Sequence, residues 1–350
     1  MNERSRERAH DRFSMMGQLV FEVTEASQVA EVRRQAIAPA STLGFSDTDV
    51  GKVAIIVTEV TTNLVKHAVQ GEVFIRWLET QGKRGVEILA LDKGPGMTNV
   101  ALSQRDGYST SGSPGTGMGA MSRLAGRFDL HSLSAKGTAV MAQVWSSCDA
   151  ELKATNSLDI GVVCRAKHNE IVCGDGWETA SFEGRQLLLV VDGLGHGVGA
   201  ATAAQAAIRI FRSNIHQSPA IIVELAHAAL RPTRGAVLAI AEIDPSQQTL
   251  RYAGVGNISG MIISNGSVRH LMSHNGTVGH DVRKIQELSY AFPLNALLVL
   301  HSDGLTSHWN LDNYAGLKLK APSLIAGVLY RDYQRRNDDV TVVVARAAAG

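Results

Sequence analysis

The pattern of hydrophobic and polar positions changes near residue 150 and divides the chain into two parts. In the first part, apolar residues at helical spacing predict helices over 26–37, over 47–69 and from about 119. Strand-like apolar runs lie at 18–24, 73–78, 86–91, 127–133 and 138–145. Ser46 or Asp47 is a suitable N-cap for the helix over 47–69. We therefore expect an α+β domain with helices on one face of a mixed sheet.

Residues 147–157 are polar and follow neither period, so we expect a linker there. Beyond it strand candidates dominate, separated by turn sequences such as DPSQQ and SNGS. These strands are predicted at 159–166, 170–173, 186–191, 235–243, 249–254, 260–264, 267–271, 296–301 and 340–346. Two helices are predicted at 198–212 and 219–230. The pattern favours a largely antiparallel sandwich covered by helices.

Composition narrows the possible partners. A chain of 350 residues is long enough for two domains, and its formal net charge of +1 offers no electrostatic footprint for nucleic acid or anionic lipid. No apolar run approaches the roughly 20 residues needed to span a bilayer, and the charged start is unlike a secretory signal, so we expect a cytoplasmic protein. Cys148, Cys164 and Cys173 lack the paired spacing of a disulfide frame or a zinc site and are interpreted as core residues.

The helix predicted over 47–69 carries two polar residues with chemical potential. Glu59 and Asn63 are four residues apart and therefore lie on one helix face. An amide oxygen is a hard ligand suited to Mg²⁺, which takes phosphate oxygens as further ligands. A carboxylate one turn away can accept a proton from an attacking hydroxyl. By itself this pair is more typical of a solvated helix face, so its meaning depends on the motifs that follow.

Two glycine motifs follow in the same half of the chain. Asp92 ends a strand and precedes Gly94 and Gly96, a turn in which a flat ring can lie close to the backbone and an exocyclic amine can donate to the carboxylate. Further on, three glycines lead directly into a helix whose free N–H groups suit an anion: Gly115, Gly117 and Gly119. No GxxxxGK[ST] sequence occurs, which excludes a P-loop as the explanation.

In this order and spacing, these residues resemble the N, G1 and G2 boxes of the GHKL ATPase/kinase superfamily, and more narrowly the RsbT type of serine/threonine switch kinase. The resemblance covers roughly residues 15–146 and implies a Bergerat-type α/β sandwich that binds ATP and Mg²⁺. It implies that Asn63 holds Mg²⁺, that Glu59 assists the phosphoryl acceptor and that Asp92 reads adenine. Many members of the superfamily only bind or hydrolyse ATP, so kinase activity is the less specific part of this expectation.

In the second half of the chain, four aspartates occur at predicted strand ends: Asp175, Asp192, Asp303 and Asp338. In an antiparallel sheet the end of one strand and the start of its neighbour share an edge, so these carboxylates can converge. Without compensation they would repel one another, whereas divalent cations between them turn that repulsion into ligation. Oxygen-only ligands favour Mg²⁺ or Mn²⁺, and two such ions can activate water and neutralise a phosphoryl group.

The sequence VVDGLGHGVGAA at 190–201 allows a second interpretation, a dinucleotide loop. However, Asp192 places a negative charge where a pyrophosphate would bind, and no acidic residue ends a following strand about 20 residues on. We therefore favour a metal-binding loop in which Asp192 bridges the ions and Gly193 supplies a carbonyl oxygen. His196 either supports the metal ligands or the start of the following helix, or it donates a proton to the leaving serine oxygen. No arginine stands out as a phosphate clamp.

The sequences GDGW, VDGLGHG, HSDG and NDDVT resemble, in order, the metal motifs of the metal-dependent protein phosphatase (PPM) superfamily in its SpoIIE/RsbX branch. The resemblance covers roughly residues 157–347 and implies an αββα sandwich. It implies a metal shell formed by Asp175, Asp192, Gly193, Asp303 and Asp338, with Asp339 the less favoured of the tandem pair. Asp175 departs from the commonest form because Gly176 and Trp177 follow it.

Both resemblances together predict a kinase domain over 15–146, a linker over 147–157 and a phosphatase domain over 158–347. The leading hypothesis is a bifunctional regulator that phosphorylates and dephosphorylates Ser or Thr of STAS-domain proteins, within a sigma-factor or stress-signalling module. We expect nucleotide or partner binding on the first domain to bias the phosphatase through the helical pair at 198–230. A first alternative makes the N-terminal domain an ATP-binding module that captures a partner, and a second makes the chain a dinucleotide oxidoreductase. The oligomeric state and the choice of Mg²⁺ or Mn²⁺ stay open.

Overall fold

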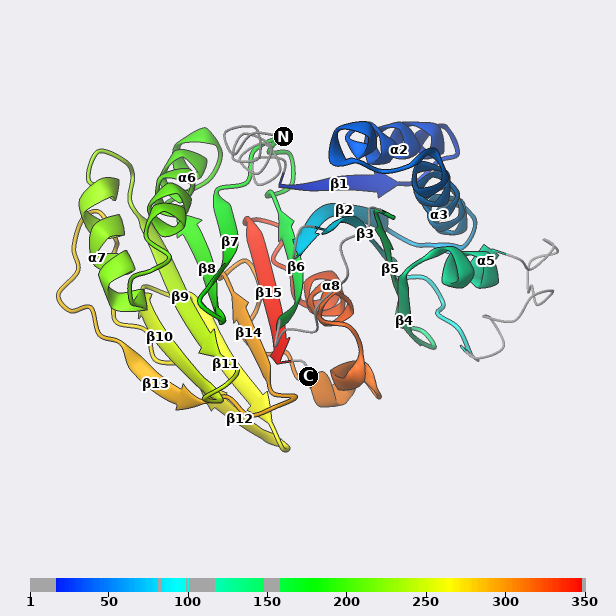
Figure 1. The fold of residues 1–350 in the computed structure, drawn as a ribbon. Helices are drawn as coiled ribbons and strands as arrows, with labels where there is room; N and C mark the ends of the chain where they lie inside the picture. Colours follow the sequence, from blue (N-terminus) through cyan, green and yellow to red (C-terminus); the bar gives the residue numbers. More distant parts are fainter. Residues whose placement is uncertain (1–16, 81–82, 99, 101–116, 148–157, 348–350) are drawn as a thin grey trace. The chain divides into compact units, whose positions relative to one another are not determined.

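The computed structural model describes residues 17–80, 83–98, 100, 117–147 and 158–347, which form two units (Figure 1). Unit 1 comprises residues 1–153 together with Leu311–Arg331, and unit 2 comprises residues 154–310 and 332–350. The predicted two-domain α+β fold is confirmed. The predicted domain boundaries differ in one respect from these units, because a stretch of the second half of the sequence belongs to unit 1.

Unit 1 contains one five-stranded sheet in the order β1-β2-β3-β5-β4. Its strands are β1 (Gln18–Val23), β2 (Gly71–Thr80), β3 (Lys83–Leu91), β4 (Arg127–Leu133) and β5 (Gly137–Trp145). Every pairing in it is antiparallel, so the prediction of a mixed sheet was wrong. The reason is that β2–β3 and β4–β5 are hairpins, and an antiparallel pair needs no helical crossover.

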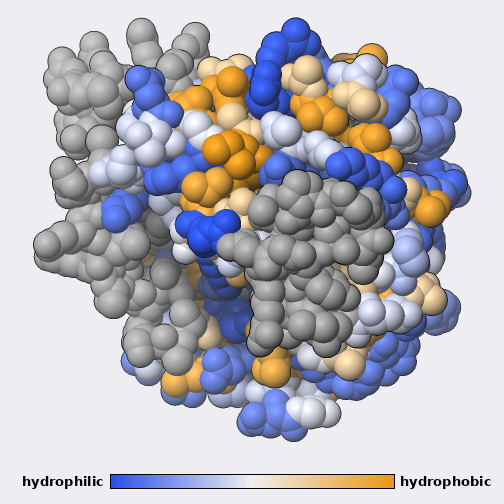
Figure 2. Space-filling model, turned by 90° about the vertical axis from the view of Figure 1, so that its right-hand side faces the viewer, coloured by the Kyte–Doolittle hydropathy of each residue, from blue (hydrophilic) through white to orange (hydrophobic). Residues whose placement is uncertain are grey.

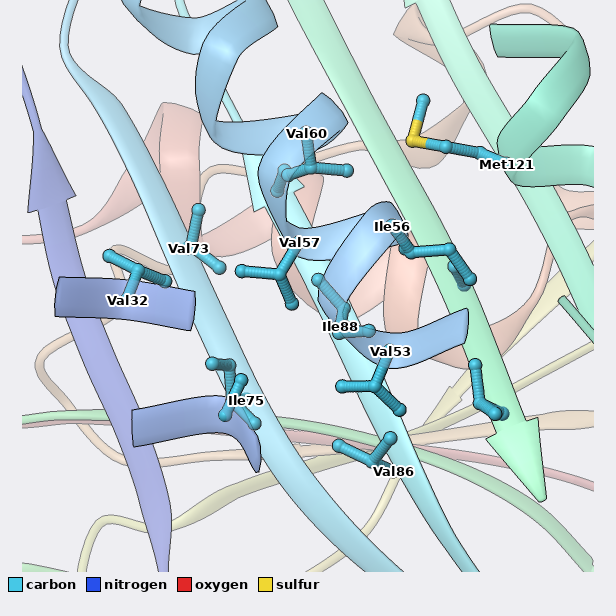
Figure 3. Close-up of a cluster of buried hydrophobic side chains, with 14 of the residues drawn as sticks. Val32, Val53, Ile56, Val57, Val60, Val73, Ile75, Val86, Ile88 and Met121 are labelled. Atoms are coloured by element: carbon cyan, nitrogen blue, oxygen red, sulfur yellow. The ribbon is translucent and has the colours of Figure 1, made fainter. Parts of the chain in front are cut away.

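Helices α2 (Ser27–Ile37), α3 (Asp47–His67) and α5 (Gly117–Leu124) cover one face of this sheet, and a short 3₁₀ turn (Ala40–Leu43) joins the first two. Figure 3 shows Val53 and Ile56 of α3 among the inward side chains of β2 and β3, which alternate along each strand. The starts of α2 and α3 and four of the five strands agree with the predicted positions within two residues, and β3 starts three residues before its predicted position. The apolar stripe of α3 therefore forms the centre of this core, and its polar flank stays accessible.

The opposite face of the sheet is covered by residues 311–331, which contain 3₁₀ turns at Leu311–Asn313 and Leu317–Leu319 and most of α8 (Pro322–Tyr333). A Cβ on Gly327 would lie 2.8 Å from Cδ2 of Leu91, so the α8 backbone packs directly on β3. Beneath it, Glu87 is fully buried and accepts hydrogen bonds from Arg76, Gln143 and Ser323. The sequence PSLIAGVLYRDY is buried on all sides and has no polar stripe, which explains why helical periodicity did not predict α8.

Unit 2 contains two antiparallel sheets in the orders β13-β10-β9-β8-β7 and β12-β11-β14-β15-β6. The first consists of β7 (Asp175–Phe182), β8 (Arg185–Gly193), β9 (Ala236–Asp244), β10 (Thr249–Val255) and β13 (Leu288–Ala291). The second consists of β6 (Leu158–Arg165), β11 (Ser259–Ser264), β12 (Ser267–His270), β14 (Leu297–His301) and β15 (Val340–Ala347). One apolar cluster lies between the sheets, and another lies between the first sheet and helices α6 (Val198–Ser213) and α7 (Pro219–Leu230). The predicted antiparallel sandwich with its helical pair is confirmed.

Three strand positions in unit 2 differ from the prediction, because 170–173 is no strand and neither β7 nor β13 was predicted. Residues 170–173 form no strand; they belong to a loop, and β7, which was not predicted, begins at Asp175. The Asp339 carboxylate accepts hydrogen bonds from the backbone N–H groups of Lys167 and Gly174, which closes the neck of this loop. The Sγ atoms of Cys164 and Cys173, at the two ends of the loop, are 3.7 Å apart as free thiols, and Cys148 lies outside the described residues.

The surface of the described residues carries few large hydrophobic side chains. On the face shown in Figure 2, hydrophobic residues gather in patches between hydrophilic ones. In unit 1 the large hydrophobic residues that are exposed in the described part include Ile55 and Val69. Among the described helices, none combines the length and the apolar character needed to cross a membrane.

The predicted N-cap of α3 is confirmed and leads to a stability prediction. Ser46 Oγ accepts from the Asp49 N–H and donates to the Asp49 carboxylate, which also accepts from Ser147. Replacing Ser46 with Ala is expected to lower the free energy of unfolding by about 1 kcal/mol in urea denaturation. The exposed turn residue Ser134, replaced by Ala, is the control, and equal stability of both variants would contradict the capping role.

The same cap has a defined pH dependence. Burial raises the pKa of Asp49, but hydrogen bonds from Ser147, Lys52 and Ser46 outweigh it and hold the pKa well below its ordinary value. The stabilisation by this carboxylate is therefore present above the pKa of the unfolded chain and is lost as the pH falls through the lower pKa of the folded state. The Ser46→Ala penalty should accordingly shrink in acid.

Candidate metal centre and nucleotide site

The candidate metal centre lies at one edge of the two sheets of unit 2. Asp175, the first residue of β7, is the cross-strand partner of Asp192 near the end of β8. Asp175 is buried, and its Oδ2 accepts a hydrogen bond of 2.6 Å from Ser302 Oγ. Ser302 in turn accepts from the Thr341 N–H at 2.9 Å, which ties the end of β14 and the start of β15 to this aspartate. These hydrogen bonds hold the start of β7 beside the end of β14 and the start of β15. Asp175 is the first residue of its strand, whereas the prediction placed it after one.

Asp303 and Asp338 come to this edge from the second sheet. A Cβ on Gly304 would overlap the carbonyl oxygen of Asp339, so the turn after Asp303 packs directly against the backbone of the tandem aspartates. Asn257 Nδ2 donates to Asp303 Oδ2 at 2.9 Å and orients that carboxylate. The Asp339 carboxylate accepts hydrogen bonds from the N–H groups of Lys167 and Gly174. Among the hydrogen bonds of the described residues, the Asp338 carboxylate accepts only the N–H of Asp339. This difference supports the preference for Asp338 as the metal ligand, which stays a prediction.

The four carboxylates interact electrostatically. Burial is the main cause that raises the pKa of Asp192 to about 9, and the charges of Asp175 and Asp303 add to it. Burial likewise raises the pKa of Asp175 to about 7, although the Ser302 hydrogen bond opposes it. For Asp338, burial and then the Asp303 charge raise the pKa. Asp175, Asp192 and Asp338 therefore lie where negative charge is unfavourable unless a cation compensates it.

The donor set fits divalent metal ions. Asp175 Oδ1 is buried and has no hydrogen-bond partner, so this oxygen is available to a ligand. Among the described residues, however, no three His, Cys, Asp or Glu side chains have the spacing of a metal site. The charges of Asp175, Asp303 and Asp338 all act on Asp192, and a metal site shared by these carboxylates stays a prediction. The oxygen-only chemistry remains that of Mg²⁺ or Mn²⁺.

The glycine loop after Asp192 makes a tight strand-to-helix turn. A Cβ on Gly193 would overlap the Ala200 carbonyl, and Gly195 and Gly197 have φ values of +86° and +70°, which favour glycine. His196 in this loop is exposed, and its Nδ1 lies 2.7 Å from Glu170 Oε1. Support of the surface loop is therefore the contact that the structure assigns to His196, and proton donation remains only a hypothesis.

Sequence analysis missed one residue beside this loop. Arg234 is exposed, and its guanidinium packs against Gly199 in the first turn of α6 and against Gly195. A Cβ on Gly199 would lie 2.6 Å from Arg234 Cζ. The residue is remote from the metal motifs along the chain, so no spacing rule could have singled it out. Its position next to a helix N-terminus adds a positive charge where an anion is already favoured.

The candidate nucleotide site lies in unit 1. A Cβ on Gly117 would lie 2.5 Å from Glu59 Oε2, so the start of α5 is directly beside the Glu59 and Asn63 face of α3. The predicted neighbours Glu59 and Gly117 are thus brought together. Gly119 is buried in the first turn of α5, and Gly115 lies outside the described residues.

Asp92 lies beyond the end of β3 in the same unit. Its Oδ1 accepts the Gly94 N–H at 2.7 Å, and its own N–H donates to the Thr138 carbonyl. Gly96 has φ +69°, and a Cβ there would overlap the Leu133 carbonyl, so this turn requires glycine. Burial raises the pKa of Asp92, while the Gly94 hydrogen bond and the Arg331 charge oppose the shift. The turn therefore presents a half-buried carboxylate beside a close-packed backbone.

Comparison with known proteins connects both sites to families. The family model for the histidine kinase-like ATPase domain matches residues 21–144, and the model for stage II sporulation protein E (SpoIIE) matches residues 183–348. The chain is 34% identical over 106 residues to the serine/threonine-protein kinase RsbT of Bacillus subtilis (strain 168), which covers 30% of this chain and 80% of RsbT.

The second half matches the phosphoserine phosphatase RsbX of Bacillus subtilis (strain 168) with 23% identity over 183 residues, or 51% of this chain and 90% of RsbX. A crystal structure of RsbX in complex with magnesium matches with a TM-score of 0.51 at 20% identity, covering 57% of this chain and 99% of that structure, which shows the shared fold. The first half of the chain therefore belongs to the RsbT-like histidine kinase-like ATPase family, and a domain that matches the SpoIIE model and shares the fold of RsbX follows it.

Proposed function

We propose that this chain is a bifunctional partner-switching regulator that phosphorylates and dephosphorylates a Ser or Thr of small STAS-domain proteins. The observation that supports the proposal is the sheet edge of unit 2 at which the charges of Asp175, Asp303 and Asp338 act on the buried Asp192. The glycine turn after Asp92 in unit 1 supports the nucleotide part. The STAS substrate class rests on the family resemblances described above.

In the phosphatase half, Asp175, Asp192, Asp303 and Asp338, with the Gly193 carbonyl, would hold two Mg²⁺ or Mn²⁺ ions. Bound ions supply Lewis-acid activation of water and neutralise charge on the phosphoryl group. The chain's own residues fix the ligands: Ser302 orients Asp175, and Asn257 orients Asp303. Arg234 and the start of α6 would bind the substrate's phosphoryl oxygens.

In the kinase half, Asn63 would hold Mg²⁺ and Asp92 would accept a hydrogen bond from the adenine amine. Gly115, Gly117 and Gly119 would leave backbone N–H groups free for the phosphates. Glu59 would accept the proton of the attacking hydroxyl or orient that hydroxyl. Its carboxylate beside the first turn of α5 supports this role, because the phosphates are expected at that turn.

Radiolabelled ATP and a phosphoserine substrate test both halves in one design. The full chain with Mn²⁺ should release phosphate from a phosphorylated STAS protein, and the Asp192→Asn variant should accumulate label on the unphosphorylated form. A second candidate function is a nucleotide-binding module that controls an active phosphatase, and the contact of Arg331 with Asp92 favours it. Bound ATP without label in the Asp192→Asn variant would favour this module over the kinase.

Arg234 gives a more specific prediction. Its replacement by Ala is expected to lower kcat/KM for a phosphorylated substrate by about tenfold, mainly through KM, because a charge-assisted hydrogen bond to the phosphoryl group is lost. Steady-state phosphate release measures this effect. The exposed Arg231 at the end of α7, replaced by Ala, is the matched control. Equal kinetics of the two variants would contradict a phosphate-binding role for Arg234.

A further inference from the structure

Residues 311–331 are an integral part of unit 1, although unit 2 precedes and follows them along the chain. Beside β4, Asp129 accepts hydrogen bonds from Lys320 Nζ at 2.8 Å and from the Ala321 N–H at 2.9 Å. Near the start of the segment, His131 Nε2 lies 3.2 Å from the Ala315 carbonyl, and Lys136 Nζ donates to the Asn313 carbonyl. The segment is thus held by polar contacts along β4 as well as by apolar packing.

The end of α8 lies at the sheet end that carries the nucleotide turn. Tyr330 donates to Glu72 Oε1 at 3.0 Å and makes an edge-to-face contact with Phe74, with ring centroids 5.3 Å apart. The next residue, Arg331, is only 3% exposed, and its Nη1 donates to the Asp92 carbonyl at 3.1 Å. A buried guanidinium from the second half of the sequence therefore contacts the residue expected to read adenine.

We propose that Arg331 is a positioning residue of the nucleotide site. The inference rests on the proposed function, in which the Asp92 carboxylate accepts a hydrogen bond from adenine. Arg331 fixes the main chain of Asp92 at the end of β3, where the Gly94 N–H already orients the side chain. An ionised carboxylate is a stronger hydrogen-bond acceptor for an amine than a protonated one, and a nearby positive charge favours the ionised form.

The charged groups that face Asp92 define the expected pH dependence. Burial raises the pKa of Asp92, and the charges of Arg331 from α8 and His67 from α3 oppose this shift. Removal of the guanidinium should therefore raise the pKa of Asp92 further. Nucleotide binding by such a variant should then be lost at a higher pH than in the wild type as the solution is acidified.

The chain after Arg331 leads directly to the candidate metal centre. The Tyr333 carbonyl accepts the Thr306 N–H at 3.0 Å, and the Arg335 N–H donates to the Gly304 carbonyl at 2.6 Å. These bonds fix the residues after α8 to the turn that follows Asp303, and Asp338 comes three residues later. We expect this segment to couple the two sites, so nucleotide binding at Asp92 should change Mn²⁺ affinity. Because coupling between two binding sites is reciprocal, Mn²⁺ should change nucleotide affinity by the same factor. The proposed linkage runs through residues 311–335, and gating by the helical pair at 198–230 stays a separate prediction.

Isothermal titration of the full chain with ADP and Mg²⁺ tests the positioning role. The Arg331→Met variant should bind ADP about tenfold more weakly, equivalent to 1.4 kcal/mol. On acidification, its affinity for ADP should also begin to fall at a higher pH than in the wild type. Arg331→Lys should restore the pH profile because the charge is kept, but only part of the affinity. Tyr330→Phe is the matched control: it removes a neighbouring hydrogen bond of α8 and should leave both the affinity and the pH profile unchanged.

The outcomes separate the inference from the proposed function. If the wild type binds ADP and Arg331→Met binds it with the same dissociation constant and pH profile, the positioning role is refuted and nucleotide binding stands. If the wild-type chain binds neither ADP nor ATP, the nucleotide part of the proposed function fails, and the inference fails with it. Should Arg331→Met not fold, the unchanged charge of Arg331→Lys predicts weaker binding with a normal pH profile, and wild-type affinity in that variant refutes the role.

A second titration tests the linkage. Mn²⁺ binding to the wild-type chain should differ between ADP-saturated and ADP-free protein, and ADP binding should differ by the same factor with and without Mn²⁺. This difference should be smaller in Arg331→Met than in Tyr330→Phe. Identical Mn²⁺ affinities with and without bound ADP would refute the linkage.

Discussion

Replacing Asp192 with Asn is expected to reduce metal-dependent phosphate release by on the order of 10³-fold and, at the same time, to stabilise the metal-free protein. Asp192 lies opposite Asp175 across the β7–β8 ladder and interacts with Asp303 and Asp338. An amide would be a poor substitute for a carboxylate in the proposed role of holding divalent cations. Activity should therefore be lost although the fold is kept.

The stability effect has the opposite sign for a physical reason. Burial, with the Asp175 and Asp303 charges, raises the pKa of Asp192 to about 9, so the unliganded site disfavours the ionised form at neutral pH. A neutral amide of the same shape avoids this cost. In the wild type, Mn²⁺ at about 100 times its dissociation constant should raise Tm by about 5–10 °C, whereas the variant should show almost no shift.

Thermal unfolding with and without Mn²⁺, together with phosphate release, measures both effects. The exposed Asp281, replaced by Asn, is the control because it removes one exposed carboxylate from the same unit. Wild-type phosphate release by Asp192→Asn would show that this carboxylate is no metal ligand. Loss of activity with an unchanged Mn²⁺ shift would place its role elsewhere than in metal binding.

Replacing Glu59 with Gln is expected to reduce transfer of phosphate from ATP to a STAS protein by about 10²–10⁴-fold, while the affinity for nucleotide changes by less than about twofold. Glutamine keeps the shape of the side chain beside Gly117 but cannot accept the proton of the attacking hydroxyl. The measurement is incorporation of label in an Asp192→Asn background, so that dephosphorylation does not hide the product.

Asn63→Ala provides the contrast, because it should weaken binding of Mg²⁺-ATP itself and therefore reduce transfer through binding. If Glu59→Gln transfers phosphate at the rate of its parent, the proton-accepting role is wrong. If the parent itself binds ATP without transferring it, unit 1 is a nucleotide-binding module, and the phosphatase is the remaining enzymatic activity.

Much of the fold follows from local patterns along the chain. The N-cap at Ser46, the apolar stripe of α3 and the alternating strands were predicted because each depends on neighbours a few residues away. The aspartates of the proposed metal edge could be named because each adjoins a strand end or turn, and their role as ligands stays a prediction. β7 was misplaced, because the loop before it is closed by Asp339, a residue far along the chain.

The features that escaped prediction depend on contacts between distant segments. Residues 322–331 of α8 are all buried, so the helix carries no periodic signature, and its packing on β3 is a property of the fold. The role proposed for Arg234 rests on its contact with Gly199, and the role proposed for Arg331 rests on its hydrogen bond to Asp92. Neither contact can be derived from spacing, because no local rule links these residues to the motifs they support.

The covering of the unit 1 sheet by residues 311–331 also has a consequence for synthesis on the ribosome. The sheet and its α2, α3 and α5 helices leave the exit tunnel long before α8 is synthesised. Phe74, Leu89 and Leu91 therefore stay exposed until α8 packs on them. At translation rates of about 5–20 residues per second, that wait lasts on the order of ten seconds or more. A nascent chain arrested in the linker should therefore expose this apolar face to chaperones, and a gene cut at the linker should yield two aggregation-prone halves.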